Sequence, residues 1–193
     1  METVRCTWAR KTKEEAEYHD TEWGVPVHDD RKLFEFLVLD AFQAGLSWLT
    51  ILRKRENFRK AFDDFDYQKI ARYDEAKIQS LLQDEGIIRN RLKVYGTVTN
   101  AQQFIKVQEE FGSFDTFIWQ FTDGKTLQNQ RAGIKDIPPR TDASDAMSKA
   151  LGKRGFKFVG STICYAFMQA AGMVNDHEIG CFRHKEVLKL AGN

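Results

Sequence analysis

The chain reads Lys-Arg-Gly-Phe-Lys-Phe-Val-Gly at residues 153–160, and this glycine-containing stretch separates two segments with helical patterning. The first segment opens at Thr141 and is expected to run through Leu151, and the second covers residues 161–172. A helix that starts near Gly160 would expose its first backbone N–H groups and the positive end of its dipole. Such a helix start binds phosphate without reading a base sequence. The stretch therefore predicts a helical hairpin with an anion-binding tip.

Basic residues gather around this predicted hairpin. They are Lys149, Lys153, Arg154 and Lys157. A solvated loop between two helices explains these charges equally well when they are considered alone. Phe156, Phe158 and Val159 lie in the same turn, and they favour a hairpin packed firmly enough to present its backbone amides to a ligand.

Apolar residues recur at helical spacing along almost the whole chain. Leu33, Phe34, Leu37 and Val38 mark one helix. A second is expected from the N-cap Asp74 to the stop at Gly86, and residues 89–111 predict one long helix or two, with Leu92 facing inward. No repeat, low-complexity tract or linker interrupts this pattern. We expect an all-α fold in which residues 1–193 form a single functional unit.

The composition is that of an ordinary soluble protein. The 193 residues suffice for one well-buried domain or two small ones that share a core. Hydrophobic residues make up 42% and charged residues 30%. The net charge of +1 neither supports nor excludes a nucleic-acid partner, because a local basic face is enough for phosphate contacts.

Three observations bear on localisation. No apolar run approaches the length that a transmembrane helix needs. Residues 1–6, Met-Glu-Thr-Val-Arg-Cys, contain no apolar signal region. Three cysteines cannot all pair within one chain, which suits a reducing compartment and leaves thiolates free for a metal. We therefore expect a cytoplasmic protein without a membrane segment.

Two cysteines and two histidines lie near the chain ends, namely Cys6, His19, His177 and Cys181. Two thiolates and two imidazoles suit tetrahedral zinc, and a closed set of four ligands is typical of a structural site. The pattern alone leaves open that these residues are scattered without a common role. The remaining cysteine and histidines receive other assignments: Cys164 in the core, His28 at the surface, and His184 at the surface or as a substitute ligand.

Aromatic residues concentrate in the first quarter of the chain, where Tyr18 accompanies Trp8, Trp23 and Trp48. Asp40 ends an apolar helical run in the same region, where burial of its carboxylate is costly unless a partner satisfies it. One interpretation is an aromatic core in which Asp40 caps a helix or turn. The other is a pocket with aromatic walls and a carboxylate floor, which would suit a planar ring that is cationic or bears an amino group.

Ordered motifs along nearly the whole chain resemble the bacterial 3-methyladenine DNA glycosylase I family, within the helix-hairpin-helix glycosylase superfamily. They are Arg-Cys-x-Trp at 5–8, Tyr-His-Asp-x-Glu-Trp-Gly-Val-Pro at 18–26, Gln-Ala-Gly-Leu-Ser-Trp at 43–48, Arg-Glu-Asn-Phe-Arg at 55–59, Gly-Ile-Ile-Arg at 86–89, Lys-Arg-Gly-Phe-Lys-Phe-Val-Gly at 153–160 and Val-Asn-Asp-His-x-x-Gly-Cys at 174–181. The resemblance implies a two-lobed, all-α fold with a cleft. It also implies that the protein removes alkylated adenine from double-stranded DNA by flipping out the base and hydrolysing its N-glycosidic bond.

The resemblance also assigns residues. It implies one structural zinc on Cys6, His19, His177 and Cys181, joining the N- and C-terminal segments. It places the base-pocket aromatics at Tyr18 and Trp48, with Trp8 and Trp23 nearby. We expect the hairpin to contact the DNA backbone through Lys153, Lys157, Val159, Gly160 and Thr162. The base-recognising carboxylate falls on Asp40, where the family normally has Glu. This departure retracts the carboxylate by about 1 Å, a displacement that matters in a positioned site.

Two further positions differ from the superfamily pattern. The catalytic Asp of many relatives corresponds to Asn175, and the nucleophilic Lys of strand-cutting members corresponds to Thr162. We therefore expect a monomeric, monofunctional glycosylase that leaves the strand intact. A DNA-binding protein without catalysis is the main alternative. A catalytic zinc hydrolase is a third, although four protein ligands leave no open position for water.

Overall fold

The computed structural model describes residues 4–192, which form ten α-helices, four short 3₁₀ helices and two short strands. The α-helices are α1 (Lys13–Thr21), α2 (Asp30–Gln43), α3 (Trp48–Ala61), α4 (Tyr67–Ile70), α5 (Glu75–Gln83), α6 (Arg91–Phe111), α7 (Phe114–Trp119), α8 (Asp142–Lys153), α9 (Ser161–Ala170) and α10 (Phe182–Leu190). The 3₁₀ helices are η1 (Thr7–Arg10), η2 (Asp63–Phe65), η3 (Gln120–Thr122) and η4 (Ile134–Asp136), and the strands are β1 (Leu127–Gln128) and β2 (Val174–Asn175). Residues 1–3 of the N-terminal stretch without an apolar signal region lie outside the described range.

Helix α2 forms the centre of the core. Every residue from Leu33 to Phe42 is buried, because the helix packs against α3, α6, α7 and α9 on several sides. Asp29 caps its first turn by accepting a hydrogen bond from the Lys32 amide. A helix that is covered all round must satisfy any polar side chain that it carries, and α2 carries both Glu35 and Asp40 into the interior.

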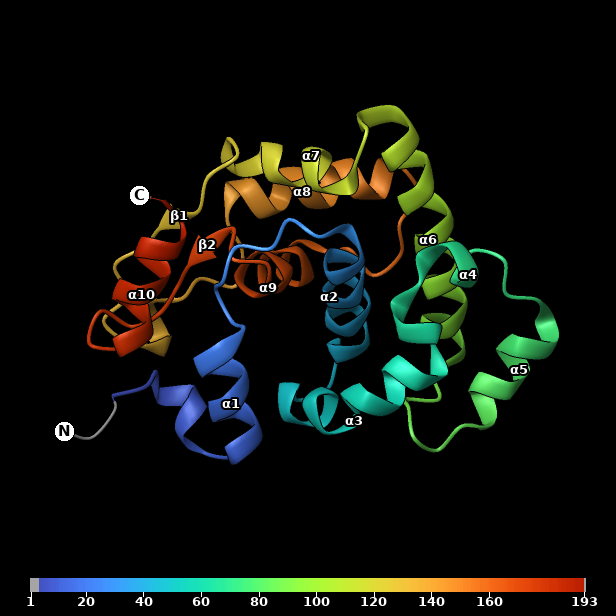
Figure 1. The fold of residues 1–193 in the computed structure, drawn as a ribbon, viewed down its shortest axis with the longest axis horizontal. Helices are drawn as coiled ribbons and strands as arrows, with labels where there is room; N and C mark the ends of the chain where they lie inside the picture. Colours follow the sequence, from blue (N-terminus) through green and yellow to red (C-terminus); the bar gives the residue numbers. More distant parts are fainter. Residues whose placement is uncertain (1–3, 193) are drawn as a thin grey trace.

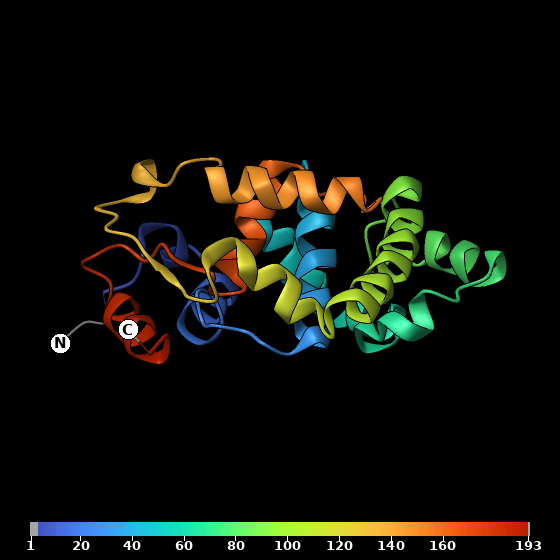
Figure 2. The ribbon, with the colours of Figure 1, turned by 90° about the horizontal axis from the view of Figure 1, so that it is seen from above.

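The two ends of the chain lie on the same side of the molecule, where α1 and α10 are neighbours in both views (Figures 1 and 2). Helices α4, α5 and α6 form the opposite side, and α2 and α9 lie between (Figure 1). Strand β2 pairs in parallel with β1, with Leu127 opposite Val174. The mostly helical fold and the junction of the terminal segments are thereby confirmed. Between residues 4 and 192, the small parallel pair and the isolated parallel bridge between Arg131 and Glu178 depart from an all-α chain.

The predicted hairpin is present and anchored on α6. Helices α8 and α9 pack against each other, and Phe156 and Val159 of the connecting turn are buried. Asn100 of α6 accepts from the Lys157 amide at 2.6 Å and donates to the Lys157 carbonyl at 3.0 Å. Gly155 adopts φ +88°, a left-handed conformation that favours glycine. The turn is therefore fixed both by the hydrogen bonds of Asn100 to its backbone and by the burial of its apolar side chains.

Two expectations about single residues were wrong. Leu92 is 73% exposed, because α6 turns Lys93, Val94 and Val98 inward instead. His184 is buried rather than superficial, and its Nε2 lies 3.1 Å from the Asn129 carbonyl oxygen. In both cases neighbouring elements decide which face of the helix is covered. Cys164 is in the core and His28 is at the surface, as expected.

Within residues 4–192, no helix combines the length and the apolar character that crossing a membrane requires.

Candidate active site and metal cluster

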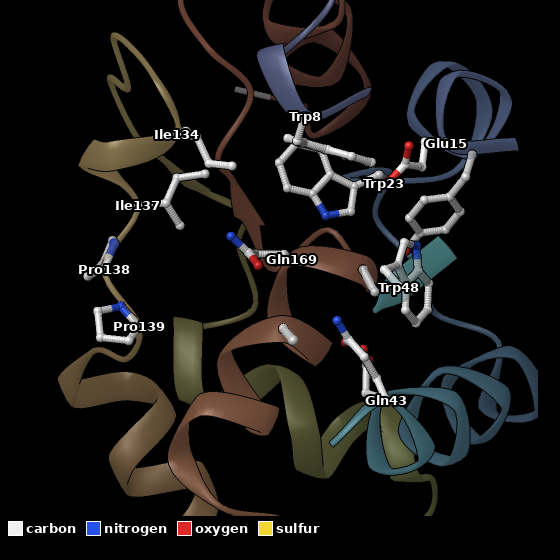
Figure 3. Close-up of a pocket in the computed structure, with 14 residues that line it drawn as sticks. Trp8, Glu15, Trp23, Gln43, Trp48, Ile134, Ile137, Pro138, Pro139 and Gln169 are labelled. Atoms are coloured by element: carbon white, nitrogen blue, oxygen red, sulfur yellow. The ribbon is translucent and has the colours of Figure 1, made fainter. Parts of the chain in front are cut away.

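One pocket of about 450 Å³ opens beside α2 (Figure 3). Its volume is in the range of small-molecule sites. Its aromatic lining comprises Trp8, Tyr18, Trp23 and Trp48; its polar lining comprises Glu15, Asp40, Gln43 and Gln169; and its remaining wall comprises Ile134, Ile137, Pro138, Pro139, Ala166 and Ala170. All five residues predicted for an aromatic pocket with a carboxylate therefore meet at one site, although they come from four different segments.

The aromatic wall is built from two ring pairs. Trp8 and Trp23 meet edge to face, with ring centroids 5.1 Å apart, and Tyr18 and Trp48 are tilted by 54° at 5.2 Å. Ser47 caps α3 by accepting from the Thr50 amide, which places Trp48 at the first position of that helix. Fixed ring faces of this kind attract a planar or cationic ligand through their negative π surfaces.

Two buried polar atoms of the pocket have no hydrogen-bond partner among the described residues, namely Asp40 Oδ2 and Trp48 Nε1. Burial raises the pKa of the Asp40 carboxyl well above its usual range, and the charge of Arg55 offsets this only in part. An unpaired buried polar atom costs about 1–3 kcal/mol. The pocket therefore carries one acceptor and one donor that only an incoming ligand or water can satisfy.

An ion-pair network lies directly behind the Tyr18 ring. The Arg55 guanidinium donates to both Glu22 carboxylate oxygens at 2.7 Å and to Glu35 Oε1 at 2.8 Å. It also lies 5.9 Å from the centroid of the Tyr18 ring. Arg55 begins the motif at 55–59, but no role was predicted for it, because its partners are 33 and 20 residues away and no local pattern joins them. The network fixes the wall that faces Asp40.

Four other parts of the lining were not predicted as pocket residues, namely Glu15, Gln43, Gln169 and the apolar wall from Ile134 to Pro139. The only available signal was Ile137-Pro138-Pro139, which marks the end of an irregular stretch. Figure 3 shows this wall across the pocket from Trp23 and Trp48.

The four predicted metal ligands form one cluster, in which Cys6, His19, His177 and Cys181 are all buried and their ligand atoms lie within 4.8 Å of one another. Sγ of Cys6 is 3.5 Å from His177 Nδ1, and Sγ of Cys181 is 3.4 Å from His19 Nε2. With metal–sulfur bonds of about 2.3 Å and metal–nitrogen bonds of about 2.0 Å, a tetrahedral site has S···N edges of about 3.5 Å. The spacing and the donor set therefore fit a tetrahedral metal ion.

Outer contacts orient both histidine rings of the cluster. His19 Nδ1 lies 2.8 Å from Asp20 Oδ1, and His177 Nε2 lies 3.0 Å from the Trp23 carbonyl oxygen. Ligand histidines usually donate their second ring nitrogen to a carboxylate or carbonyl in this manner. The hydrogen bond from Cys6 lowers the pKa of Cys181, which favours the thiolate form that binds a metal. The metal-facing nitrogens are thereby assigned as Nε2 of His19 and Nδ1 of His177.

The predicted backbone-contact residues lie on the hairpin that carries the pocket. Lys153, Lys157, Gly160 and Thr162 are exposed, whereas Val159 is buried under the turn. No side chain among residues 4–192 caps α9, so its first N–H groups after Gly160 have no side-chain partner. Helix α9 also supplies Ala166, Gln169 and Ala170 to the pocket. A phosphate at the helix start and a base in the pocket would therefore be held by one rigid element.

Asn175, which the resemblance matches to the catalytic Asp of many relatives, is closed to solvent. Asn175 is fully buried, and its Nδ2 donates to Gln128 Oε1 at 2.8 Å and to the His184 carbonyl at 3.1 Å. Its role is to join β1, β2 and α10, which explains why an amide rather than a carboxylate occupies it.

Comparison with known proteins gives matches along nearly the whole chain. The family model described as methyladenine glycosylase matches residues 8–184. DNA-3-methyladenine glycosylase 1 of Escherichia coli K12 is 49% identical over 177 residues, which cover 92% of this chain and 95% of that protein. DNA-3-methyladenine glycosylase of Haemophilus influenzae is 44% identical over 179 residues, covering 93% and 97%.

Solved structures show the same fold. A crystal structure of a 3-methyladenine DNA glycosylase I superposes with a TM-score of 0.90 at 51% identity, covering 93% of this chain and 98% of that one. A Staphylococcus aureus 3-methyladenine DNA glycosylase I, solved to explain 3-methyladenine recognition, gives a TM-score of 0.89 at 35% identity, covering 92% and 95%.

Proposed function

The chain belongs to the methyladenine glycosylase family, and we propose that this DNA-3-methyladenine glycosylase uses the aromatic pocket to hold 3-methyladenine that has been flipped out of alkylated DNA. The base then leaves by hydrolysis of its N-glycosidic bond, and the DNA strand stays intact. Double-stranded DNA that contains alkylated adenine is the substrate.

The observation that carries this proposal is the pair of unpartnered buried atoms, Asp40 Oδ2 and Trp48 Nε1. Adenine methylated at N3 is a cation with an exocyclic amino group that donates and ring nitrogens that accept. It can give a hydrogen bond to Asp40 and accept one from Trp48. Its positive charge also stabilises the ionised Asp40 carboxylate, which burial otherwise disfavours. An unmethylated, neutral adenine gains none of this charge interaction, so the pocket selects the lesion.

The hairpin supplies the grip on DNA. A stacked base cannot reach the pocket, so the nucleotide must rotate out of the duplex at a cost of roughly a few kcal/mol. Phosphate contacts at the start of α9, supported by Lys153 and Lys157, offset that cost without reading sequence. Because α9 also lines the pocket, the distance between the bound phosphate and the flipped base is fixed by one helix.

The bond to the sugar needs little assistance. A cationic base leaves as a neutral molecule, so no general acid has to protonate it. Selection and positioning therefore account for most of the required catalysis. Thr162 stands where strand-cutting relatives have a lysine, so no Schiff base forms and the backbone is not cut.

The cluster of Cys6, His19, His177 and Cys181 would hold one Zn²⁺. The ion would contribute structure only, because four protein ligands close its coordination sphere. It would tie the β2–α10 connection to η1 and α1, which carry Trp8 and Tyr18. Free thiols that serve as metal ligands are also consistent with the reducing cytoplasm in which we place the protein.

The test uses the purified protein and methylated double-stranded DNA, with released bases separated by chromatography. We expect release of 3-methyladenine above the spontaneous rate and no release of normal adenine. The DNA strand should stay intact, and borohydride should trap no covalent complex between the protein and the DNA. Binding to the DNA without release of 3-methyladenine would instead establish a non-catalytic DNA-binding protein.

A further inference from the structure

We propose that Gln169 positions the water that attacks the sugar, and that the buried carboxylate of Asp176 holds the Gln169 amide in the required orientation. This inference rests on the proposed function, because it concerns hydrolysis of the 3-methyladenine nucleotide. Gln169 lies on α9 and lines the pocket. Figure 3 shows its side chain between Ile137 on one side and Trp48 on the other.

The orientation of the Gln169 amide follows from its neighbour. Asp176 accepts four hydrogen bonds: from Asn129 Nδ2 at 2.8 Å and Arg131 Nε at 2.9 Å on Oδ1, and from the Tyr165 hydroxyl at 2.6 Å and Gln169 Nε2 at 2.9 Å on Oδ2. A carboxylate only accepts, so the NH₂ group of Gln169 must face Asp176. Its carbonyl oxygen, Oε1, then faces away from that network.

This oxygen is available to a water molecule. Among residues 4–192, no group donates a hydrogen bond to Gln169 Oε1, and the atom is not one of the buried polar atoms without a partner. The base subsite is formed by Asp40, Tyr18 and Trp48. The sugar of a base bound there remains joined to the DNA and lies outside this subsite. Gln169 projects into the same pocket, between Ile137 and Trp48 (Figure 3), and we therefore place its fixed acceptor beside the glycosidic carbon.

Other candidates for this role are less suitable. The Asp176 side chain is fully buried and already accepts four hydrogen bonds, so it acts only through Gln169. Asn175 is buried and bonded. Asp40 faces the base in the proposed function. Glu15 reaches the pocket from the first turn of α1 and accepts from Thr12 Oγ1 at 2.9 Å, so it is the competitor that the experiment must separate.

The step balances without a further reactant. The bond between C1′ and the base nitrogen breaks, and its electron pair leaves with the base, which becomes neutral 3-methyladenine. Water held by Gln169 Oε1 directs a lone pair at C1′ and forms the new C–O bond. The proton that this oxygen loses passes to bulk water, because a neutral amide oxygen orients the water without taking its proton. The products are the free base, an abasic sugar and one proton.

The experiment compares single-turnover release of 3-methyladenine from methylated duplex by the wild type, Gln169→Met and Glu15→Gln. Methionine keeps the volume of the side chain and removes the acceptor. We expect Gln169→Met to lower the rate roughly tenfold to a hundredfold, the size of a lost positioning contact. Affinity for the free base 3-methyladenine, followed by tryptophan fluorescence, should change by no more than about twofold, since the base subsite is untouched.

A double-mutant cycle tests the positioning role of Asp176. Asp176→Asn should lower the same rate, and adding it to Gln169→Met should cause no further loss, because both act on one water. Asn129→Ala serves as the matched control, since it removes a donor from the other oxygen of Asp176 and leaves the Gln169 contact in place.

Each result bears on one claim. A wild-type protein that releases no 3-methyladenine contradicts the proposed function itself. The role of Gln169 is overturned if the wild type releases 3-methyladenine and Gln169→Met releases it at the same rate. It is also overturned if only Glu15→Gln loses activity. Gln169→Met requires no buried substitution, so the test stands even if Asp176→Asn does not fold.

Discussion

Nε2 of His177 lies 3.0 Å from the backbone carbonyl oxygen of Trp23, so the imidazole that offers Nδ1 to the metal cluster also supports the pocket wall with its other nitrogen. The Trp23 and His177 rings also meet edge to face at 4.6 Å, and Trp8 lies 5.5 Å from His19. Two of the four aromatic residues that line the pocket therefore contact the cluster directly.

Removing the metal should weaken both the fold and the pocket. Chelation, or Cys181→Ser, is expected to lower the melting temperature by about 10 °C or more, since a structural metal contributes several kcal/mol and each kcal/mol corresponds to about 2–4 °C at this size. Zinc content by elemental analysis and melting curves with and without chelator provide the check. Cys164→Ser is the control, because Cys164 is a buried cysteine that does not belong to the cluster, so the variant should keep one zinc per chain. A chelated protein with an unchanged melting curve contradicts a structural metal.

Asp40→Asn should impair base release while altering how stability depends on pH. The pKa of Asp40 is higher in the folded protein than in the unfolded chain, so ionisation of this carboxyl opposes folding. Below the unfolded-state pKa, Asp40 is protonated in both states and this ionisation costs no stability. As the pH rises toward the folded-state pKa, the stability of the wild type should fall. Asp40→Asn removes that decline. Melting temperatures of both proteins between pH 4 and pH 8 test this, and the difference should grow in favour of the variant with rising pH.

Activity separates charge from shape at the same position. Asp40→Glu keeps a carboxylate and should retain base release, whereas Asp40→Asn should lose roughly tenfold or more, the order expected for a hydrogen bond to a charged group. If Asp40→Asn releases 3-methyladenine as fast as the wild type, Asp40 does not recognise the base.

Trp48→Phe should weaken affinity for the free base without weakening the fold. The substitution keeps an aromatic face and removes Nε1, a buried donor without a partner among the described residues. We expect about a fivefold to tenfold loss of affinity for 3-methyladenine, equivalent to one hydrogen bond of about 1 kcal/mol or slightly more. Calorimetric titration with the base measures this. An unchanged affinity would mean that Nε1 does not bind the ligand.

Glu22→Gln should reduce resistance to acid. Burial by itself raises the pKa of Glu22, but the hydrogen bonds and charges of Arg55 and Lys32 outweigh it and lower the pKa from 4.5 to about 2. A lowered carboxyl pKa adds stability above the unfolded value, and that stability is lost as pH falls from about 4.5 to about 2. Urea denaturation at pH 7 and pH 3 should show a destabilised variant at pH 7 and a much smaller difference at pH 3.

The matched control for this measurement is Glu56→Gln, which changes an exposed partner of Arg59 in the same network. It should alter stability by less than about 0.5 kcal/mol at either pH, as is usual for exposed ion pairs. If the two substitutions change stability equally, the contact between Glu22 and Arg55 does not stabilise the protein more than an exposed ion pair does.

Asn100→Ala should separate DNA binding from base binding. Asn100 makes two hydrogen bonds to the Lys157 backbone, and their loss should free the hairpin turn at a cost of about 1–3 kcal/mol. We expect weaker binding to undamaged duplex, measured by fluorescence anisotropy, with unchanged affinity for free 3-methyladenine. Gln102→Ala, on the exposed face of the same helix, is the control. A variant that binds duplex normally would show that the hairpin clamp is not needed.

Much of the fold and part of the site could be predicted from the sequence. Helical periodicity located the central helix around Leu33–Val38, and cap residues such as Asp74 and Thr141 marked where helices begin. The four metal ligands and the aromatic residues were found as well, since Cys, His and Trp are rare enough for their positions to carry information. These signals are local: each depends on residue type and on spacing along one short stretch.

Only the tertiary structure decided which polar groups would be satisfied. Glu22 and Glu35 both pair with Arg55, whereas Asp40 on the same central helix as Glu35 is left without such a partner, and the helical pattern does not distinguish the surroundings of the two carboxylates. In the same way, Asp176 became a fully bonded anchor through contacts with two separate segments, the stretch after β1 and helix α9, and the contact with α9 made Gln169 an oriented amide. The reason is physical. A helix's period determines which side chains share a face, but burial, ionisation and hydrogen bonding depend on what the packed neighbours bring to that face.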